Sequence, residues 1–235
     1  MSIAQNVAAI RARMDRAARE AGREPSDILL CAATKMNDAA RVREAVQAGV
    51  DCCGENRVQE LTEKLPQGAY EGVPVHFIGH LQTNKVNKVV GAVDLIQSVD
   101  RLELLAAVNK AALKKGVCQK ILFEINIGNE PQKGGFTLDE ARVLAGQMGA
   151  YPGVLLCGLM AIPPISEKKG DNCKYFAKMR NLFVDIAAEK YDNVSMVCLS
   201  MGMTDDFEDA IAQGATMIRV GTAIFGARQY QIQTS

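Results

Sequence analysis

The chain has 235 residues, 27 Lys plus Arg against 27 Asp plus Glu, seven cysteines and a hydrophobic fraction of 48%. This length suits one large domain or two small ones, and the zero net charge argues against nucleic acid or an anionic membrane as the partner. No apolar run is long enough for a membrane span, no signal peptide opens the chain, and several cysteines lie in apolar runs, so we expect a cytoplasmic protein with reduced thiols and a small-molecule ligand.

The first two predicted elements are a helix and a buried strand that ends in a lysine. Apolar residues three and four apart predict a helix over residues 3–21, with Gly22 as its stop. Residues 28–34 suit a strand buried on both faces, so Lys35 stands at its carboxyl end and points into a mouth or crevice. Lysine is the usual Schiff-base residue because burial readily shifts its pKa. From this stretch alone, a solvated lysine that starts a loop is the alternative.

The rest of the chain alternates between predicted strands and predicted helices. Strands are expected at residues 50–54, 75–80, 94–99, 121–127, 154–162, 194–199 and 217–220. Helices are expected at residues 38–48, 58–65, 84–90, 101–114, 137–149, 175–190 and 205–213. Capping boxes are expected at Thr137 with Glu140 and at Asp205 with Glu208.

This alternation predicts the fold class. Parallel strands need long crossovers, and about eight strand–helix units in roughly 250 residues predict an α/β fold, a single closed (β/α)8 TIM barrel over residues 1–235. An open doubly wound sheet is the alternative. It usually carries a glycine-rich fingerprint after its first strand, and this chain has Lys35-Met36-Asn37-Asp38 there.

Two glycine- and hydroxyl-containing turns follow the last two predicted strands. Ser200 and Gly202 follow the seventh strand, and Gly221 and Thr222 follow the eighth. In such barrels phosphate commonly binds at these two loops, where backbone N–H groups, hydroxyls and a helix amino end near Asp205 would meet it. The alternative is that the glycines only form tight turns.

A phosphate site beside a strand-end lysine suggests a phosphorylated aldehyde held as a Schiff base, and pyridoxal 5'-phosphate is the obvious candidate. Arg219 shares a strand face with Gly221, from which its guanidinium would donate to the pyridine nitrogen. Because arginine stays protonated, that nitrogen would stay unprotonated and the ring would be a weak electron sink. A structural ion pair inside the barrel is the alternative for Arg219.

Several motifs together resemble the YggS-type pyridoxal-phosphate homeostasis proteins, also called the PROSC family. The resemblance extends from Val7 to Arg228 and implies a barrel like the amino-terminal domain of alanine racemases. The blocks that carry it are residues 33–35, 54–60, 76–85, 158–160, 199–206 and 219–226. Two positions depart mildly from the family, since Thr34 stands where Ser is frequent and Arg57 where Tyr is frequent.

The resemblance also implies roles for individual residues. Lys35 would form the aldimine with the cofactor, Asn56 would lie near its ring substituents, and Arg219 would face the pyridine nitrogen. His80 and Met160 would line the barrel mouth. The phosphate cradle would consist of Ser200, Gly202, Gly221 and Thr222.

The sequence leaves a carrier and an enzyme as the main functional hypotheses. Alanine racemase needs a second base, a tyrosine from a separate β domain, and this chain ends shortly after its last predicted strand. None of its own tyrosines is well placed: Tyr70, Tyr151, Tyr175, Tyr191 and Tyr230. We therefore expect a protein without catalytic residues that holds pyridoxal phosphate, buffers its free level and supplies PLP-dependent apoenzymes.

The alternatives are a slow PLP-dependent amino-acid racemase and a barrel that binds another phosphorylated metabolite without a Schiff base. No metal site is expected, because His76 and His80 would lie about 13 Å apart along one strand. The oligomeric state is expected to be a monomer or a weak homodimer.

Overall fold

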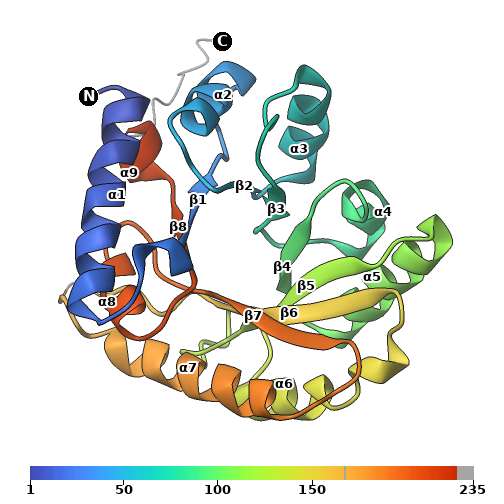
Figure 1. Ribbon diagram of the computed structural model, residues 1–235. Helices are drawn as coiled ribbons and strands as arrows, with labels where there is room; N and C mark the ends of the chain where they lie inside the picture. Colours follow the sequence, from blue (N-terminus) through green and yellow to red (C-terminus); the bar gives the residue numbers. More distant parts are fainter. Residues whose placement is uncertain (167, 227–235) are drawn as a thin grey trace.

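Eight parallel strands close into a barrel in the computed structural model, which describes residues 1–166 and 168–226 (Figure 1). Each strand pairs with its neighbours in chain order, and β8 pairs with β1 to close the ring, so the predicted (β/α)8 barrel is confirmed. Tyr230 and the end of the resemblance at Arg228 lie outside the described residues. The strands are β1 Leu29–Ala33, β2 Cys52–Glu55, β3 Val75–Phe77, β4 Leu95–Val99, β5 Gln119–Ile125, β6 Val154–Ala161, β7 Val194–Ser200 and β8 Met217–Val220.

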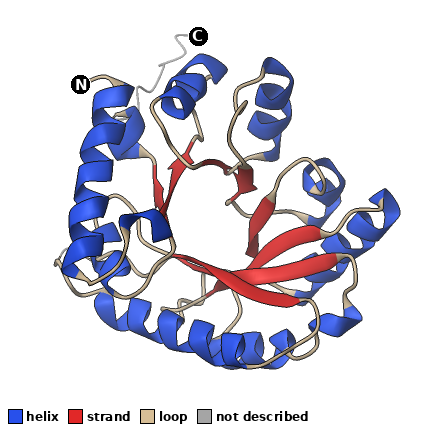
Figure 2. Ribbon diagram, in the orientation of Figure 1, coloured by secondary structure: helices blue, strands red, loops and turns tan. Residues whose placement is uncertain are grey.

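The helices form an outer layer around the strands (Figure 2). Helix α1 precedes the barrel and packs against α2, α8 and α9. None of the helices in the described part of the chain has the length and apolar content needed to span a lipid bilayer. The helices are α1 Ile3–Glu20, α2 Ala39–Gln47, α3 Val58–Lys64, α4 Val86–Val89, α5 Leu102–Lys115, α6 Leu138–Ala145, α7 Cys173–Ala188, α8 Phe207–Ala212 and α9 Thr222–Phe225.

One predicted capping box is confirmed and the other is wrong. The Thr137 hydroxyl accepts from the Glu140 N–H at 3.2 Å, and the Glu140 carboxylate accepts from the Thr137 N–H at 2.8 Å. The box expected at Asp205 does not form, because α8 begins later, at Phe207. Asp206 there accepts from the N–H of Met203 at 2.8 Å instead and closes the preceding turn.

The strand predicted at residues 75–80 ends early, at Phe77, and two backbones come very close just beyond it. A Cβ atom at Gly79 would lie 2.1 Å from the carbonyl oxygen of Asn56, so no larger side chain fits there. His80 consequently lies in a loop at the carboxyl end of the barrel. The helix predicted at residues 84–90 is a 3-10 turn, Thr83–Lys85, followed by α4.

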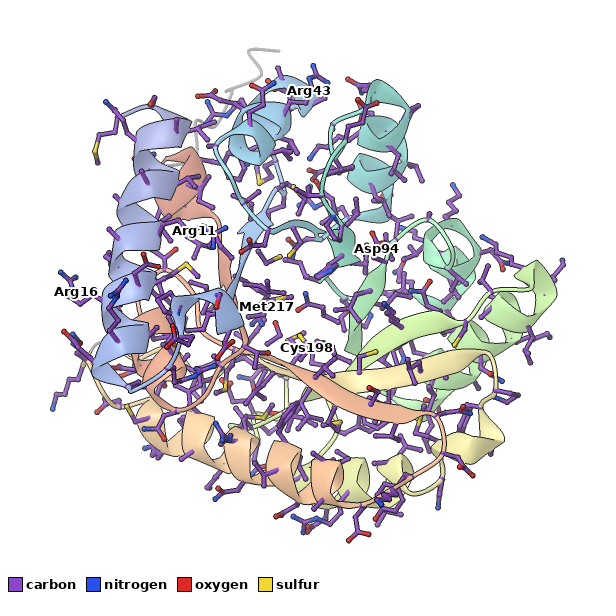
Figure 3. The ribbon with its side chains drawn as sticks, in the orientation of Figure 1. Arg11, Arg16, Arg43, Asp94, Cys198 and Met217 are labelled. Carbon is purple, nitrogen blue, oxygen red and sulfur yellow. The ribbon has the colours of Figure 1, made fainter. Side chains whose placement is uncertain are left out.

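The inside of the barrel is a packed core rich in sulfur. Figure 3 shows Cys198 and Met217 within the ring of strands, and both belong to a buried cluster. Met160, expected at the mouth, is 1% exposed and belongs to the same cluster. The other members are Cys31, Cys52, Leu95, Leu122 and Cys157. As in other barrels of this class, the interior is filled with side chains.

Candidate functional site

Lys35, Asn56 and Gly221 follow neighbouring strands at the carboxyl end of the barrel. Ala33 on β1 pairs with Gly54 on β2, which places the segments that follow, at Lys35 and Asn56, side by side. On the other side of β1, a Cβ atom at Gly221 would lie 3.3 Å from the Ala33 carbonyl oxygen. The glycine therefore lets the loop after β8 approach the strand end that carries Lys35.

The residues on both sides of Lys35 are held in place, while Lys35 itself is exposed. The Thr34 N–H donates to the Gly54 carbonyl at 2.9 Å, and its hydroxyl donates to Glu55 Oε1 at 2.6 Å. The Met36 N–H donates to Glu60 Oε2 at 2.7 Å, with Met36 in the left-handed region at φ 61°. These contacts fix the backbone at Lys35 and leave its side chain at the surface of the barrel mouth.

A buried ion network lies directly against this strand end. Lys64 Nζ donates to the Thr34 carbonyl at 3.0 Å, to Glu55 Oε1 at 2.7 Å and to Glu60 Oε2 at 3.0 Å, which uses all three N–H groups of an ammonium. The Tyr70 hydroxyl also donates to Glu55 Oε1, at 3.0 Å. Burial and the nearby Glu55 carboxylate raise the pKa of Tyr70, so its phenol stays protonated and donates.

This network was not predicted, although two signals for it are present in the sequence. Glu60 and Lys64 stand four residues apart on one predicted helix, a spacing that favours an ion pair. Glu55 is a carboxylate at the end of a predicted buried strand, where a cationic partner is required.

Arg219 is buried inside the barrel and contacts neutral acceptors. Its guanidinium donates to the Ser200 hydroxyl at 2.6 Å and to the Ala161 carbonyl at 3.0 Å. The Ser200 hydroxyl in turn donates to Gln97 Oε1 at 2.7 Å. Desolvation lowers the pKa of Arg219. Ser200 thus directs its hydroxyl to Arg219 and Gln97, whereas the sequence analysis expected that hydroxyl at the phosphate cradle.

The alternative of an ion pair for Arg219 finds no partner in the residues described: no carboxylate forms a salt bridge with it. A buried guanidinium with neutral partners retains a positive potential inside the barrel.

The loops after β7 and β8 differ in how they depend on glycine. Gly202 has φ +93°, and a Cβ atom there would lie 2.6 Å from the Cβ of Ala210 in α8, so the loop packs closely on that helix. Gly221 precedes α9, whose first residue is the exposed Thr222. The first N–H groups of a helix have no acceptor within the helix, so this turn offers donors to an anion.

Three polar side chains occupy the other side of the mouth. His80 Nδ1 lies 3.2 Å from Asp100 Oδ2. Burial and the nearby Asp100 raise the pKa of Glu124 to about 7, whereas Arg219 and Lys133 oppose the shift. The sequence analysis did not identify Asp100 or Glu124, since neither belongs to a recognisable motif.

Asn56 supplies a direct indication of a ligand. Its side-chain Oδ1 is buried and has no hydrogen-bond partner in the structure. Buried polar atoms without a partner are rare in folded proteins, and a bound molecule is one common explanation. The exposed amine of Lys35 follows the adjacent strand β1, and the first N–H groups of α9 follow β8 on the other side of β1, so an amine, an amide oxygen and anion donors come from three successive strand ends.

The comparisons with known proteins agree with this geometry. Residues 5–229 match the family model of the alanine racemase N-terminal domain. The pyridoxal phosphate homeostasis protein of Aquifex aeolicus (strain VF5) is 39% identical over 98% of this chain and 100% of its own length. The one from Escherichia coli (strain K12) is 38% identical over 97% of each chain. The structure of PipY from Synechococcus elongatus PCC7942 with PLP bound has a TM-score of 0.83 and 31% identity, covering 96% of this chain and 100% of PipY.

Proposed function

This chain belongs to the family of the alanine racemase N-terminal domain, and we propose on that basis that it binds pyridoxal 5'-phosphate and serves in the homeostasis of this cofactor. The observation that carries the proposal is the fixed strand end at Lys35, with an unsatisfied Asn56 oxygen and a glycine-built turn at Gly221 on the adjacent strand ends. The PLP bound to PipY and the names of the curated relatives support it. We take residues 1–235 as one cofactor-binding domain.

The residues proposed to hold the cofactor have distinct tasks. The Lys35 amine forms the covalent link to the aldehyde carbon, and Arg219 faces the ring nitrogen. Asn56 binds a ring substituent with its unused hydrogen-bonding capacity. The phosphate binds at the loops after β7 and β8, through Gly202, Gly221 and Thr222, while the Ser200 hydroxyl holds Arg219 in place. When bound, the cofactor supplies an electrophilic carbon and an electron sink.

The surrounding residues favour holding the cofactor over transforming a substrate. Lys64, Glu55 and Glu60 fix the backbone next to Lys35, so the amine is presented without loss of main-chain freedom on binding. Arg219 stays protonated and can only donate to the ring nitrogen. That nitrogen therefore stays unprotonated, and the ring is a weak electron sink. A reversible link at an exposed lysine also suits release, so we propose that the protein buffers PLP and passes it to apoenzymes.

The test is the visible absorption spectrum of the purified protein after incubation with pyridoxal phosphate, followed by borohydride reduction and mass mapping. We expect a yellow protein with the phosphopyridoxyl mass on Lys35. Lys35→Ala is expected to stay colourless, and Lys114→Ala, which changes an exposed lysine in α5, is expected to behave as the wild type. A colourless wild type, or an adduct on another lysine, would contradict the proposed anchor.

A slow PLP-dependent racemase is a second candidate, favoured by the groups opposite Lys35. Glu124, with a pKa of about 7, and the His80–Asp100 pair are proton acceptors at the same mouth. This activity predicts that L-alanine acquires deuterium at Cα in heavy water and forms D-alanine, and that Glu124→Gln slows the exchange. Absence of exchange over many hours with a yellow protein favours the carrier.

A further inference from the structure

Three potential metal ligands meet inside the barrel, on the strands β1, β2 and β3 and next to Arg219. Cys31 on β1 and Cys52 on β2 are directly paired across the two strands, and His76 stands on β3, the next strand. Their ligand atoms all lie within 4.8 Å of one another. All three residues are buried, with exposed fractions of 0%, 1% and 6%.

We propose that Cys31, Cys52 and His76 form a binding site for a soft monovalent d10 cation, Cu+. Thiolate and imidazole are the ligands that select such ions, and carboxylate, the ligand of hard cations, is missing from the set. With metal–sulfur bonds of about 2.3 Å, ligand atoms around one ion lie roughly 3.5–4.0 Å apart. The cluster therefore needs only a small contraction, because strand pairing already places the two cysteines side by side.

Gln97 holds the imidazole in a way that suits a ligand. Its Nε2 lies 2.9 Å from His76 Nδ1, so Nε2 of the imidazole is the nitrogen left for an ion. Metal-bound histidines almost always hydrogen-bond through their other nitrogen. Because the Gln97 amide donates to Nδ1 in this structure, the imidazole proton is on Nε2; an ion on Nε2 shifts that proton to Nδ1 and requires the Gln97 amide to flip, which exchanges its contacts with Ser200 and Met217.

The charge balance favours a monovalent ion. Arg219 on β8 pairs with Cys31 on β1. Its guanidinium forms no salt bridge with a carboxylate of the described residues. Two thiolates with Cu+ carry one negative charge, which the guanidinium offsets. With Zn2+ the site would be neutral and would leave the guanidinium without a direct anionic contact, which is costly in a low dielectric.

The shell around the three ligands is also soft. Met217 Sδ accepts a hydrogen bond from Gln97 Nε2 at 3.2 Å, so a thioether lies next to the group that orients His76. Cys157, Cys198 and Met160 belong to the same buried cluster. Zn2+ usually takes four ligands, whereas three soft ligands in an apolar interior suit Cu+.

The test uses Cu+ supplied under nitrogen as its bicinchoninate complex, with the protein free of PLP. Cys118→Ser/Cys173→Ser serves as the starting protein, since these changes remove the cysteines that are not buried. We expect it to withdraw one Cu+ per chain, while adding Cys31→Ser, Cys52→Ser or His76→Gln lowers the affinity at least 100-fold. Cys53→Ala, a buried cysteine outside the cluster, is the control and is expected to retain the ion.

If the proteins with substituted ligands fail to fold, the Cu+-loaded starting protein still allows a test of the three ligands. X-ray absorption of the Cu+-loaded starting protein is expected to show two sulfur neighbours and one nitrogen neighbour. Failure to compete with bicinchoninate, unchanged binding in the Cys31→Ser protein, or tighter retention of Zn2+ than of Cu+ would each overturn the assignment. So would a Cys31–Cys52 disulfide, detected as a loss of 2 Da, in anaerobically prepared protein.

Discussion

Among the described residues, two cationic side chains are buried, Lys64 and Arg219, and their surroundings differ. The ammonium of Lys64 has two carboxylate partners, Glu55 at 2.7 Å and Glu60 at 3.0 Å. The guanidinium of Arg219 donates to the hydroxyl of Ser200 and the carbonyl of Ala161, both neutral. Both side chains are nearly inaccessible, with exposed fractions of 5% for each residue.

The difference separates a structural charge from a functional one. A buried charge is tolerated when it is paired, and Lys64 is paired within the fold, where it fixes the backbone beside Lys35. Arg219 keeps a positive potential that the described residues do not neutralise by direct contact. Arg219 therefore stabilises an anionic or electron-rich group inside the barrel. The ring nitrogen of the proposed cofactor and the two thiolates of the proposed Cu+ site are such groups.

The largest effect is expected from removing Lys64. Lys64→Met leaves Glu55 as an uncompensated buried carboxylate, which typically costs about 3–5 kcal/mol of folding free energy. Urea unfolding monitored by circular dichroism measures this loss. Lys88→Met, at an exposed lysine of α4, is the control and is expected to stay within about 0.5 kcal/mol of the wild type. A loss below 1 kcal/mol for Lys64→Met would mean that the ion pair is not the structural charge described here.

Tyr70→Phe is expected to have a smaller effect on the same network. The phenol is one of three donors to Glu55 Oε1, with Lys64 and Thr34. Loss of a hydrogen bond to a charged group costs about 1.5–3 kcal/mol, and the two remaining donors place the expected loss at the lower end. The same urea series measures it. Equal losses for Tyr70→Phe and Lys64→Met would show that hydrogen bonding, and not charge, dominates the network.

Arg219→Met is expected to cost less stability still and to impair ligand binding more. Two neutral hydrogen bonds are lost, each contributing about 1 kcal/mol, but the desolvation cost of the guanidinium is relieved at the same time. We expect a net loss of about 1 kcal/mol in urea unfolding, together with weaker PLP retention in dialysis. A loss of folding free energy as large as that of Lys64→Met would show that Arg219, like Lys64, is a structural charge.

The sequence predicted the repeating architecture well because hydrophobic periodicity reports directly on strands and helices. The position of Lys35 just after a strand was predicted because a continuous apolar run precedes it, and the eight strands were predicted from their alternation with helices. Contacts between side chains on different strands were harder to predict from the sequence. The meeting of Cys31, Cys52 and His76 depends on strand register, which a single sequence does not reveal.

Two other differences have equally local causes. Helix α8 begins later than predicted, because the Asp206 carboxylate accepts a hydrogen bond from the N–H of Met203. The capping pattern does not show which of the two neighbouring aspartates makes such a contact. The direction of the Ser200 hydroxyl was missed because its partners, Arg219 and Gln97, come from other strands.

The smallest expected effect is a pH dependence that reports on the potential of Arg219. Burial and Asp100 raise the pKa of Glu124 to about 7, above the ordinary value near 4.5, so the folded state binds a proton that the unfolded state releases. Stability is then fully present at low pH and is lost as the pH rises toward and through 7. From pH 6 to pH 8 the expected loss is about 1 kcal/mol, and Glu124→Gln should remove it.

Arg219 opposes the shift, as does Lys133, so Arg219→Met should move the midpoint of the loss to higher pH. Urea unfolding at intervals of half a pH unit measures all three proteins. An unmoved midpoint in Arg219→Met would show that the guanidinium charge is compensated after all, and the two buried cations would no longer differ.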